Sequence, residues 1–388
     1  MTRPDVVIVG AGIVGAACAL ALARESLDVL IVDASFAGGG STAAAMGHLV
    51  VMDDSPAQLA LTAYSRGVWE RMADELPPNC EYETRGTLWV ADGEDDLGAA
   101  HAKQALYAAH GVASSIVSGA ELARMEPALV HGLAGALFVP GDGVLYPPNA
   151  ARWYMERAVA LGARLREHCT AVSIGGGAVR VRDAGGAGDS ISAGAIVNAA
   201  GVDAPQLTPG LPIVPRKGHL VITDRYPGLC HSQLVELGYL RSAHGLGGES
   251  VAFNVQPRAT GQLLIGSSRE LAGRDPAVNA SVLGAMVRRA TRFVPALAQC
   301  EAIRVWTGFR PATPDGLPLI GRWDREPGVW IAAGHEGLGI TTAPGTAALI
   351  AAGITGQPAP FAAAPFGPSR PMSGQHGADS GEAPCPVT

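Results

Sequence analysis

The chain has 388 residues, which is enough for two domains of ordinary size, and 48% of them are hydrophobic, so a large core can form. The net charge is −7 and no long basic run occurs, which argues against nucleic acid as the main partner. The six cysteines include no CxxC pair and the ten histidines no HExxH pair. We therefore expect reduced thiols in a cytoplasmic protein, and no metal or iron–sulfur site held by this chain.

An apolar run at residues 6–23 is 18 residues long, the lower limit for a membrane span. The preceding MTRPD carries no net positive charge and no convincing cleavage site follows, so the run does not resemble a signal peptide. Its glycines explain it better, and we expect no transmembrane segment.

Gly10, Gly12 and Gly15 form the pattern GxGxxG between a β-branched segment and an alanine-rich one, and a second apolar segment ends at Asp33. This order predicts a strand, a tight turn, a helix and a second strand that together bind a dinucleotide. The first glycine permits the turn, the second lets backbone approach the pyrophosphate, and the third lets helix and strand pack closely. Asp33 would accept a hydrogen bond from a ribose hydroxyl. The alternative, a buried hydrophobic hairpin, leaves Asp33 unexplained.

The next segment, residues 37–50 (AGGGSTAAAMGHLV), combines glycines with small hydroxyl side chains. It suits a loop that lies against a long cofactor, whereas the alternative is a flexible surface loop. The GxGxxG motif alone does not decide between NAD and FAD.

Helical and strand patterns alternate along the rest of the chain. We predict helices at 55–76, 147–165 (capped near Asn149), 283–297 and 342–354, and strands at 84–91, 168–174, 219–224, 250–257 and 261–268. The basic stretch 288–292 falls on the solvated face of an amphipathic helix. The tail 372–388 is rich in Gly, Ser, Pro and Ala, and we expect it to be disordered.

Further motifs make the chain similar to a known family. They are IVNAAGVDA (196–204), GQLLIGSSRE (261–270), GFRPATPDGLPLIG (308–321) and AAGHEGLGIT (332–341). With the GxGxxG unit they resemble, in order and spacing, the D-amino-acid oxidase family of FAD enzymes over roughly residues 6–370. Many members carry Glu where this chain has Asp33.

Within the family, three segments are most similar to bacterial D-hydroxyproline dehydrogenases: PRKGHLVITDRY, HSQLVELGYLRSAHG and FNVQPRATGQLLIGSS. Glycine oxidase and the flavin subunit of hydrogen cyanide synthase belong to the same group.

The resemblance implies an α/β fold, in which a Rossmann-type (glutathione-reductase-like) FAD-binding domain is interleaved with an α+β substrate domain built on a mixed β-sheet. The FAD-binding domain would comprise residues 1–48, 144–217 and 305–371, and the substrate domain residues 49–143 and 218–304.

The resemblance also implies cofactor and substrate positions. FAD would contact Gly10, Gly12, Ile13, Val14, Gly15, Asp33, Ala34, Gly40, Ser41, Thr42, Gly47, His48, Val172, Ala200, Gly201, Gly308, Gly334, His335, Glu336, Gly337, Leu338, Gly339, Ile340 and Thr341. A helix N-terminus after 334–341 would face the flavin N1 and C2 carbonyl, unless it is an ordinary helix cap.

Substrate contacts would come from Arg310, His48, Asn254 and Glu336. Arg310 would hold the substrate carboxylate with its planar guanidinium, unless it forms a structural salt bridge with Asp315 or Glu336.

Three pocket positions differ from those of glycine oxidase and its relatives. His48 takes the place of a glycine oxidase methionine, Asn254 that of a pocket tyrosine, and Gly337 that of a pocket arginine. The pocket is therefore expected to be roomier than one for glycine and to suit a ring bearing a hydroxyl, although His48 has a purely structural alternative. Glu336 would accept a hydrogen bond from a substrate amine or solvate its loop.

The activity implied is hydride transfer from the Cα of a small amino or imino acid to flavin N5, with a D-hydroxyproline or D-proline as substrate. No acid–base residue is assigned. Two other classes stay open. One is an O2-using glycine, sarcosine or D-amino-acid oxidase, and the other is a non-catalytic flavoprotein or the flavin subunit of an electron-transfer complex. Expected partners are a small iron–sulfur or other electron-acceptor subunit, in a homo- or hetero-oligomer, in the cytoplasm or at the inner membrane face.

Overall fold

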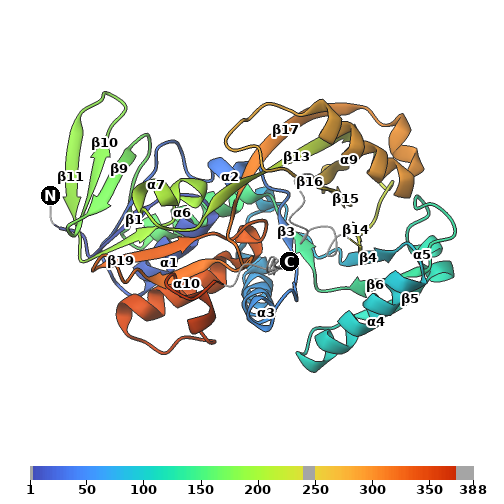
Figure 1. The fold of residues 1–388 in the computed structure, drawn as a ribbon, viewed down its shortest axis with the longest axis horizontal. Helices are drawn as coiled ribbons and strands as arrows, with labels where there is room; N and C mark the ends of the chain where they lie inside the picture. The colour runs from blue at the N-terminus through green and yellow to red at the C-terminus, as the bar shows by residue number, and fades with distance from the viewer. Residues whose placement is uncertain (1–2, 239–249, 373–388) are drawn as a thin grey trace, which may run out of the picture.

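The computed structural model describes residues 3–238 and 250–372, which form two bodies that lie side by side (Figure 1). Residues 373–388 of the predicted tail and part of the segment HSQLVELGYLRSAHG lie outside the described residues. No helix in the described ranges has the length and apolar character needed to cross a bilayer. Within the same ranges no group of three or more His, Cys, Asp or Glu side chains is arranged to hold a metal.

The first body is built on a six-stranded sheet, counted over the described residues, in the order β18-β19-β12-β1-β2-β8. Its strands are β1 (Val6–Val9), β2 (Val29–Val32), β8 (Arg164–Arg166), β12 (Ala195–Asn198), β18 (Leu319–Arg322) and β19 (Val329–Ala333). All neighbours pair in parallel except β18 with β19. Strands β1, β2 and β12 are buried along their whole length, as expected for a parallel sheet covered on both faces.

Three long helices pack together beside this sheet: α1 (Ile13–Arg24), α6 (Pro147–Ala160) and α10 (Gly339–Thr355). Alanines of α1, such as Ala16 and Ala19, are fully buried, and their small side chains let the neighbouring helices approach closely. A three-stranded sheet of β9 (Thr170–Gly175), β10 (Ala178–Arg182) and β11 (Gly188–Ser192) extends from one end of this body (Figure 1).

The second body contains an eight-stranded sheet, again counted over the described ranges, in the order β17-β13-β16-β15-β14-β4-β6-β5. Its strands are β4 (Thr87–Ala91), β5 (Ser115–Ser118), β6 (Gly135–Val139), β13 (Val214–Arg225), β14 (Gln233–Glu236), β15 (Ser250–Pro257), β16 (Gln262–Arg269) and β17 (Ala302–Ala312). The sheet is mixed, because β14 runs parallel to β4 while the other pairs are antiparallel. The predicted mixed sheet is thus confirmed.

Helices α9 (Ala280–Phe293) and α4 (Glu94–Ala109) pack on strands of this sheet, with α5 (Gly119–Met125) beside β5 and β6. The remaining elements are the short ladder of β3 (His48–Leu49) with β7 (Gly143–Val144), and the helices α2 (Gly40–Ala43), α3 (Pro56–Arg71) and α7 (Ala204–Leu207). Although α3 falls in the range assigned to the substrate domain, it packs on α10 of the first body. The domain boundaries stay a prediction.

Three helix boundaries differ from the sequence expectations. Helix α6 begins at Pro147, not near Asn149, because two prolines suit the first helical positions, and Asn149 donates its side-chain N–H to the carbonyl of Asn79. Helix α9 begins at Ala280, capped by the Asn279 side chain, and ends before Pro295. Helix α10 begins three residues before the predicted start, so 339–341 form its first turn.

Candidate active site

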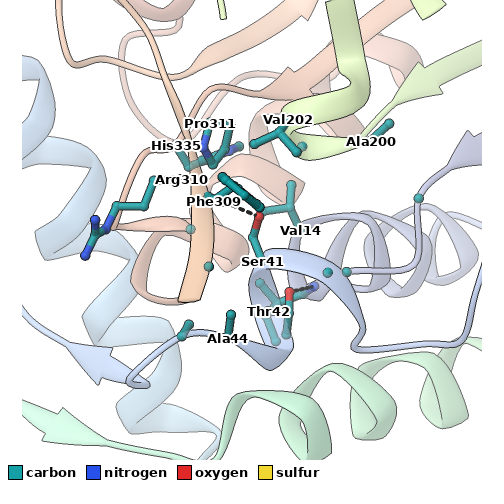
Figure 2. A pocket seen from close by; sticks show the side chains of 18 of the residues that line it. Val14, Ser41, Thr42, Ala44, Ala200, Val202, Phe309, Arg310, Pro311 and His335 are labelled. Atoms are coloured by element: carbon teal, nitrogen blue, oxygen red, sulfur yellow. Dashed lines mark hydrogen bonds between the residues drawn. The ribbon is translucent and has the colours of Figure 1, made fainter. Parts of the chain in front are cut away.

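A single cavity of about 590 Å³ brings most of the predicted site residues together. It opens at the carboxyl ends of β1 and β2 and extends to the large sheet, where β13, β15, β16 and β17 contribute to its wall. In open α/β sheets, ligands generally bind in the crevice outside the carboxyl ends of the parallel strands, and this cavity lies at such a crevice. Figure 2 shows Ala200 and Arg310 on opposite sides of the view, with Ser41 and Thr42 between them.

The turn between β1 and α1 is closely packed around its glycines. Gly10 has a φ of +106°, and a Cβ there would lie 2.5 Å from the carbonyl oxygen of Ala199. A Cβ on Gly15 would lie 1.9 Å from the carbonyl oxygen of Gly10. Gly12 offers no capping side chain to α1, and Gly12 and Ile13 line the cavity. This end of α1 therefore presents backbone N–H groups and a positive dipole to an anion.

Asp33 follows β2 and lines the same part of the cavity. Its Oδ2 accepts a 2.7 Å hydrogen bond from the Ala11 backbone N–H, and its Oδ1 accepts one of 2.7 Å from Ser35. These bonds fix the carboxylate beside the glycine turn, where further lone pairs can accept from a ligand hydroxyl.

The loop with α2 connects this turn to the large sheet. The Thr42 hydroxyl accepts a 3.0 Å hydrogen bond from the Ile13 N–H, and the Ser41 hydroxyl donates one of 2.6 Å to the carbonyl of Phe309 (Figure 2). The predicted cofactor loop is thus tied to both ends of the cavity.

The first turn of α10 forms another wall. Gly339 and Ile340 line the cavity, and the N-cap residue Leu338 makes no capping hydrogen bond with its side chain. Thr341 uses its hydroxyl to bond the His48 carbonyl at 2.9 Å. The preceding His335 is buried, which lowers its pKa to about 3, and its Nε2 lies 2.9 Å from the Thr346 hydroxyl.

Arg310 extends from β17 into the cavity wall and is half-buried. Its guanidinium lies against Gly218, where a Cβ would come within 2.5 Å of a guanidinium nitrogen, and it donates a 2.9 Å hydrogen bond to the Ser268 carbonyl. Asp315, one expected alternative partner, forms a bidentate pair with Arg370.

Glu336, the other expected partner, is held in an ionic cluster. It pairs with Arg216 at 3.2 Å and with Arg269 at 3.1 Å, and its backbone adopts a left-handed φ of +47°. Burial alone would raise the pKa of Glu336, but the charges of Arg269, Arg310 and Arg216 hold it below its ordinary value. The carboxylate is therefore ionised and already engaged with arginines.

Three polar side chains form a wall, which we call the polar wall: His48, Asn254 and Ser267. Among the described residues, His48 Nε2, Asn254 Oδ1 and Ser267 Oγ are buried and have no hydrogen-bond partner. Burial and the nearby Arg258 charge lower the pKa of His48 to about 4, so its imidazole is neutral at pH 7. Buried polar atoms without partners are costly, and a ligand with donors and acceptors would satisfy them.

Some predicted site residues do not line the cavity, and others were missed. Those off the cavity surface are Gly15, Val172, Gly334, Leu338 and Thr341. Val172 is exposed, whereas its neighbours Thr170 and Ala171 reach the cavity. Lining residues that sequence reasoning missed include Ser35, Met46, Gln206, Leu207, Gly218, Leu220, Ser267 and Phe309. For Ser267 and Leu220 the one available signal was the alternation of side chains between the two faces of a strand. That signal indicates the cavity only when the pairing register of β13, β15 and β16 is known.

Comparison with known proteins gives consistent matches over almost the whole chain. The family model described as "DAO: FAD dependent oxidoreductase" matches residues 5–352. Glycine oxidase of Geobacillus kaustophilus is 29% identical over 381 residues, 95% of this chain and 97% of that protein. The hydrogen cyanide synthase subunit HcnC of Pseudomonas aeruginosa is 28% identical over 415 residues, 93% of this chain and 95% of that protein.

Comparison with solved structures gives matches that agree with the sequence comparisons. The crystal structure of the G. kaustophilus glycine oxidase has a TM-score of 0.85 and 28% identity, covering 96% of this chain and 100% of that one. The L-proline dehydrogenase of P. horikoshii has a TM-score of 0.83 at 23% identity, covering 94% of this chain and 97% of that one, a likeness of fold.

Proposed function

Because this chain belongs to the DAO family of FAD-dependent oxidoreductases, we propose that it oxidises a small amino or imino acid at Cα, with a D-hydroxyproline such as cis-4-hydroxy-D-proline, or D-proline, as substrate. The observation that carries the proposal is one cavity that joins a dinucleotide turn, an arginine and the polar wall.

FAD is the cofactor of this family, and the cavity has features that fit it. Two long helices, α1 and α10, begin at its surface; neither N-cap residue supplies a capping side chain, although the Thr42 hydroxyl accepts from the first N–H of α1, that of Ile13. Asp33 stands beside the first helix, where a ribose hydroxyl would bond. In this proposal the α1 turn and Thr42 would hold the pyrophosphate, and the first turn of α10 would offer its N–H groups to the flavin, which gains negative charge on reduction.

FAD supplies the acceptor for the hydride that leaves the substrate Cα. Arg310 binds the substrate carboxylate with two parallel N–H bonds, which hold and orient the molecule in the cavity. Leu220, Phe309 and Pro311 line the cavity near Arg310 with apolar surface that excludes water and strengthens this pair. Glu336 stays bound to its arginines, so it shapes the charge around Arg310 and does not serve as a proton acceptor.

The polar wall supports a hydroxylated ring as substrate. A substrate hydroxyl can both donate and accept a hydrogen bond. It can donate to Asn254 Oδ1, and it can donate to or accept from Ser267 Oγ or His48 Nε2. The substrate amine binds neutral or gives its proton to water before hydride leaves, and neutral His48 can accept a hydrogen bond from the remaining N–H. No residue is assigned as a catalytic base.

The test is a substrate screen with a dye as electron acceptor. D-hydroxyprolines, D-proline, other D-amino acids, glycine and sarcosine are offered to the purified FAD-bound protein. We expect the highest kcat/KM with a D-hydroxyproline. If no amino or imino acid is oxidised, the proposal fails; if glycine or sarcosine is preferred, the hydroxyproline assignment fails.

A second candidate is an oxidase that uses O2, which the likeness to glycine oxidase favours. Mixing the reduced protein with air-saturated buffer in a stopped-flow instrument separates the two. Fast reoxidation with stoichiometric hydrogen peroxide supports the oxidase, and slow reoxidation supports the dehydrogenase.

A third candidate is the flavin subunit of a complex, favoured by the likeness to a hydrogen cyanide synthase subunit. Purification from the native host, followed by iron and sulfide analysis of the pure sample, tests it. A stoichiometric iron–sulfur partner supports this candidate, and a homogeneous single chain contradicts it.

A further inference from the structure

Helix α10 contains a proline in its second turn. Pro344 has no backbone N–H, so the carbonyl of Ile340, four residues earlier, lacks its normal helical donor. Ile340 is in the first turn of α10, lines the cavity and is buried. A buried carbonyl without a donor would destabilise the turn that begins the helix.

The indole of Trp69, on helix α3, occupies the place of the missing donor. Its Nε1–H donates at 3.1 Å to the carbonyl of Ile340 and at 3.1 Å to that of Thr341. Trp69 is fully buried, so water does not compete for this bond. Nearby, Ser65 of α3 accepts a 3.2 Å hydrogen bond from the Gly345 N–H.

The same turn is tied to the polar wall. The Thr341 hydroxyl donates to the carbonyl of His48 and accepts from the N–H of Val50 at 3.3 Å. A shift of the first turn of α10 would therefore move both its own N–H groups and the backbone that carries His48.

We propose that Trp69 is a positioning residue of the flavin site: its indole N–H replaces the hydrogen bond that Pro344 removes and holds the first turn of α10 against the flavin. The inference rests on the proposed location of FAD in this cavity. N–H groups held at the flavin edge stabilise the reduced form, so loosening the turn lowers the reduction potential of the bound FAD.

The experiment is a double-mutant cycle between Trp69→Phe and Pro344→Ala. Phenylalanine removes the N–H donor and some volume, whereas alanine at 344 restores a backbone donor to Ile340. We measure the midpoint potential of bound FAD by equilibration with a reference dye, and the FAD dissociation constant. Trp69→Phe alone should lower the equilibrium constant for reduction at least threefold, about 15 mV for a two-electron couple, and weaken FAD binding.

In the Pro344→Ala background the same Trp69→Phe change should alter both quantities less than twofold, because the lost volume is the same but the carbonyl now has its own donor. The matched control is Trp153→Phe, a buried tryptophan of the same core that makes no described bond to α10. It should lower the melting temperature and leave the potential unchanged.

An unchanged potential in Trp69→Phe, or an equal shift in both backgrounds, would overturn the inference and assign Trp69 to packing alone. If Trp69→Phe does not fold, the double variant decides: a folded double variant with the potential of Pro344→Ala supports the inference, and any other result contradicts it. Failure of the wild-type protein to bind FAD would instead refute the proposed function.

Discussion

Replacing Arg310 by alanine should cost the enzyme most of its activity on carboxylate substrates while leaving FAD in place. The guanidinium is half-buried in the cavity wall, so its bond to a carboxylate is partly shielded from water. Loss of one partner of a desolvated ion pair costs about 2–5 kcal/mol. Because Arg310 is only partly buried we take about 3 kcal/mol, which is roughly 150-fold in kcat/KM. Arg310→Lys keeps the charge but loses the fork, so we expect about 1–2 kcal/mol.

The assay compares kcat/KM for an amino acid and for its amide, which has no carboxylate. The loss in Arg310→Ala should be large for D-proline and below threefold for D-prolinamide. Arg304→Ala is the matched control, since Arg304 lies on the same strand but is exposed and stacks on Trp306. Equal losses on acid and amide, or loss of FAD from Arg310→Ala with full activity in Arg310→Lys, would show that the arginine is structural.

Four further predictions follow from the same cavity. Asn254→Ala should reduce kcat/KM for hydroxyproline more than for proline, by about 1–2 kcal/mol; equal losses would mean that Asn254 does not contact the hydroxyl. Gly12→Val should abolish FAD binding in an equilibrium titration. Gly12 has an extended backbone that other residues can adopt and it lines the cavity, so the loss would come from the added side chain, which meets the ligand and Thr42; retained yellow colour would contradict the assigned pyrophosphate position. With the preferred substrate, dye reduction should exceed hydrogen peroxide production, and the reverse ratio would favour the oxidase. Finally, burial lowers the pKa of His48 from an ordinary 6.5 to about 4. Between these values the unfolded chain binds more protons than the folded protein, so the free energy of unfolding falls as the pH drops from about 6.5 to 4. Thermal unfolding of His48→Gln should show a smaller loss of stability over that window, and a pH profile identical to that of the wild type would contradict the burial of the His48 ring.

The parts of the site built from short sequence patterns could be predicted well. The β1–α1–β2 unit follows from GxGxxG and Asp33, because the glycines, the turn and the acid lie within one continuous segment. The start of α10 was placed three residues late, since Gly337 and Gly339 suggested a loop although Gly339 is the first helical residue. Glycine disfavours helix interiors but is tolerated at the first turn.

Other parts depend on contacts between distant segments. Ser267 reaches the cavity only through the pairing of β13, β15 and β16, a register that the sequence does not reveal. The cluster in which Glu336 meets Arg216 and Arg269 joins residues 67 to 120 positions apart, so no local pattern signals it. Val172 was assigned by resemblance; its side chain is 42% exposed, while the neighbouring Thr170 and Ala171 line the cavity.

The most direct test of the central claim is anaerobic titration of the purified, FAD-bound protein with cis-4-hydroxy-D-proline while the visible flavin band is recorded. We predict that one equivalent bleaches the band fully, that the product is the cyclic imine, and that Arg310→Ala under the same conditions keeps its FAD but is not bleached on the same time scale. A wild-type protein that carries FAD yet stays fully oxidised with this substrate, with D-proline and with the other amino acids of the screen would contradict the account.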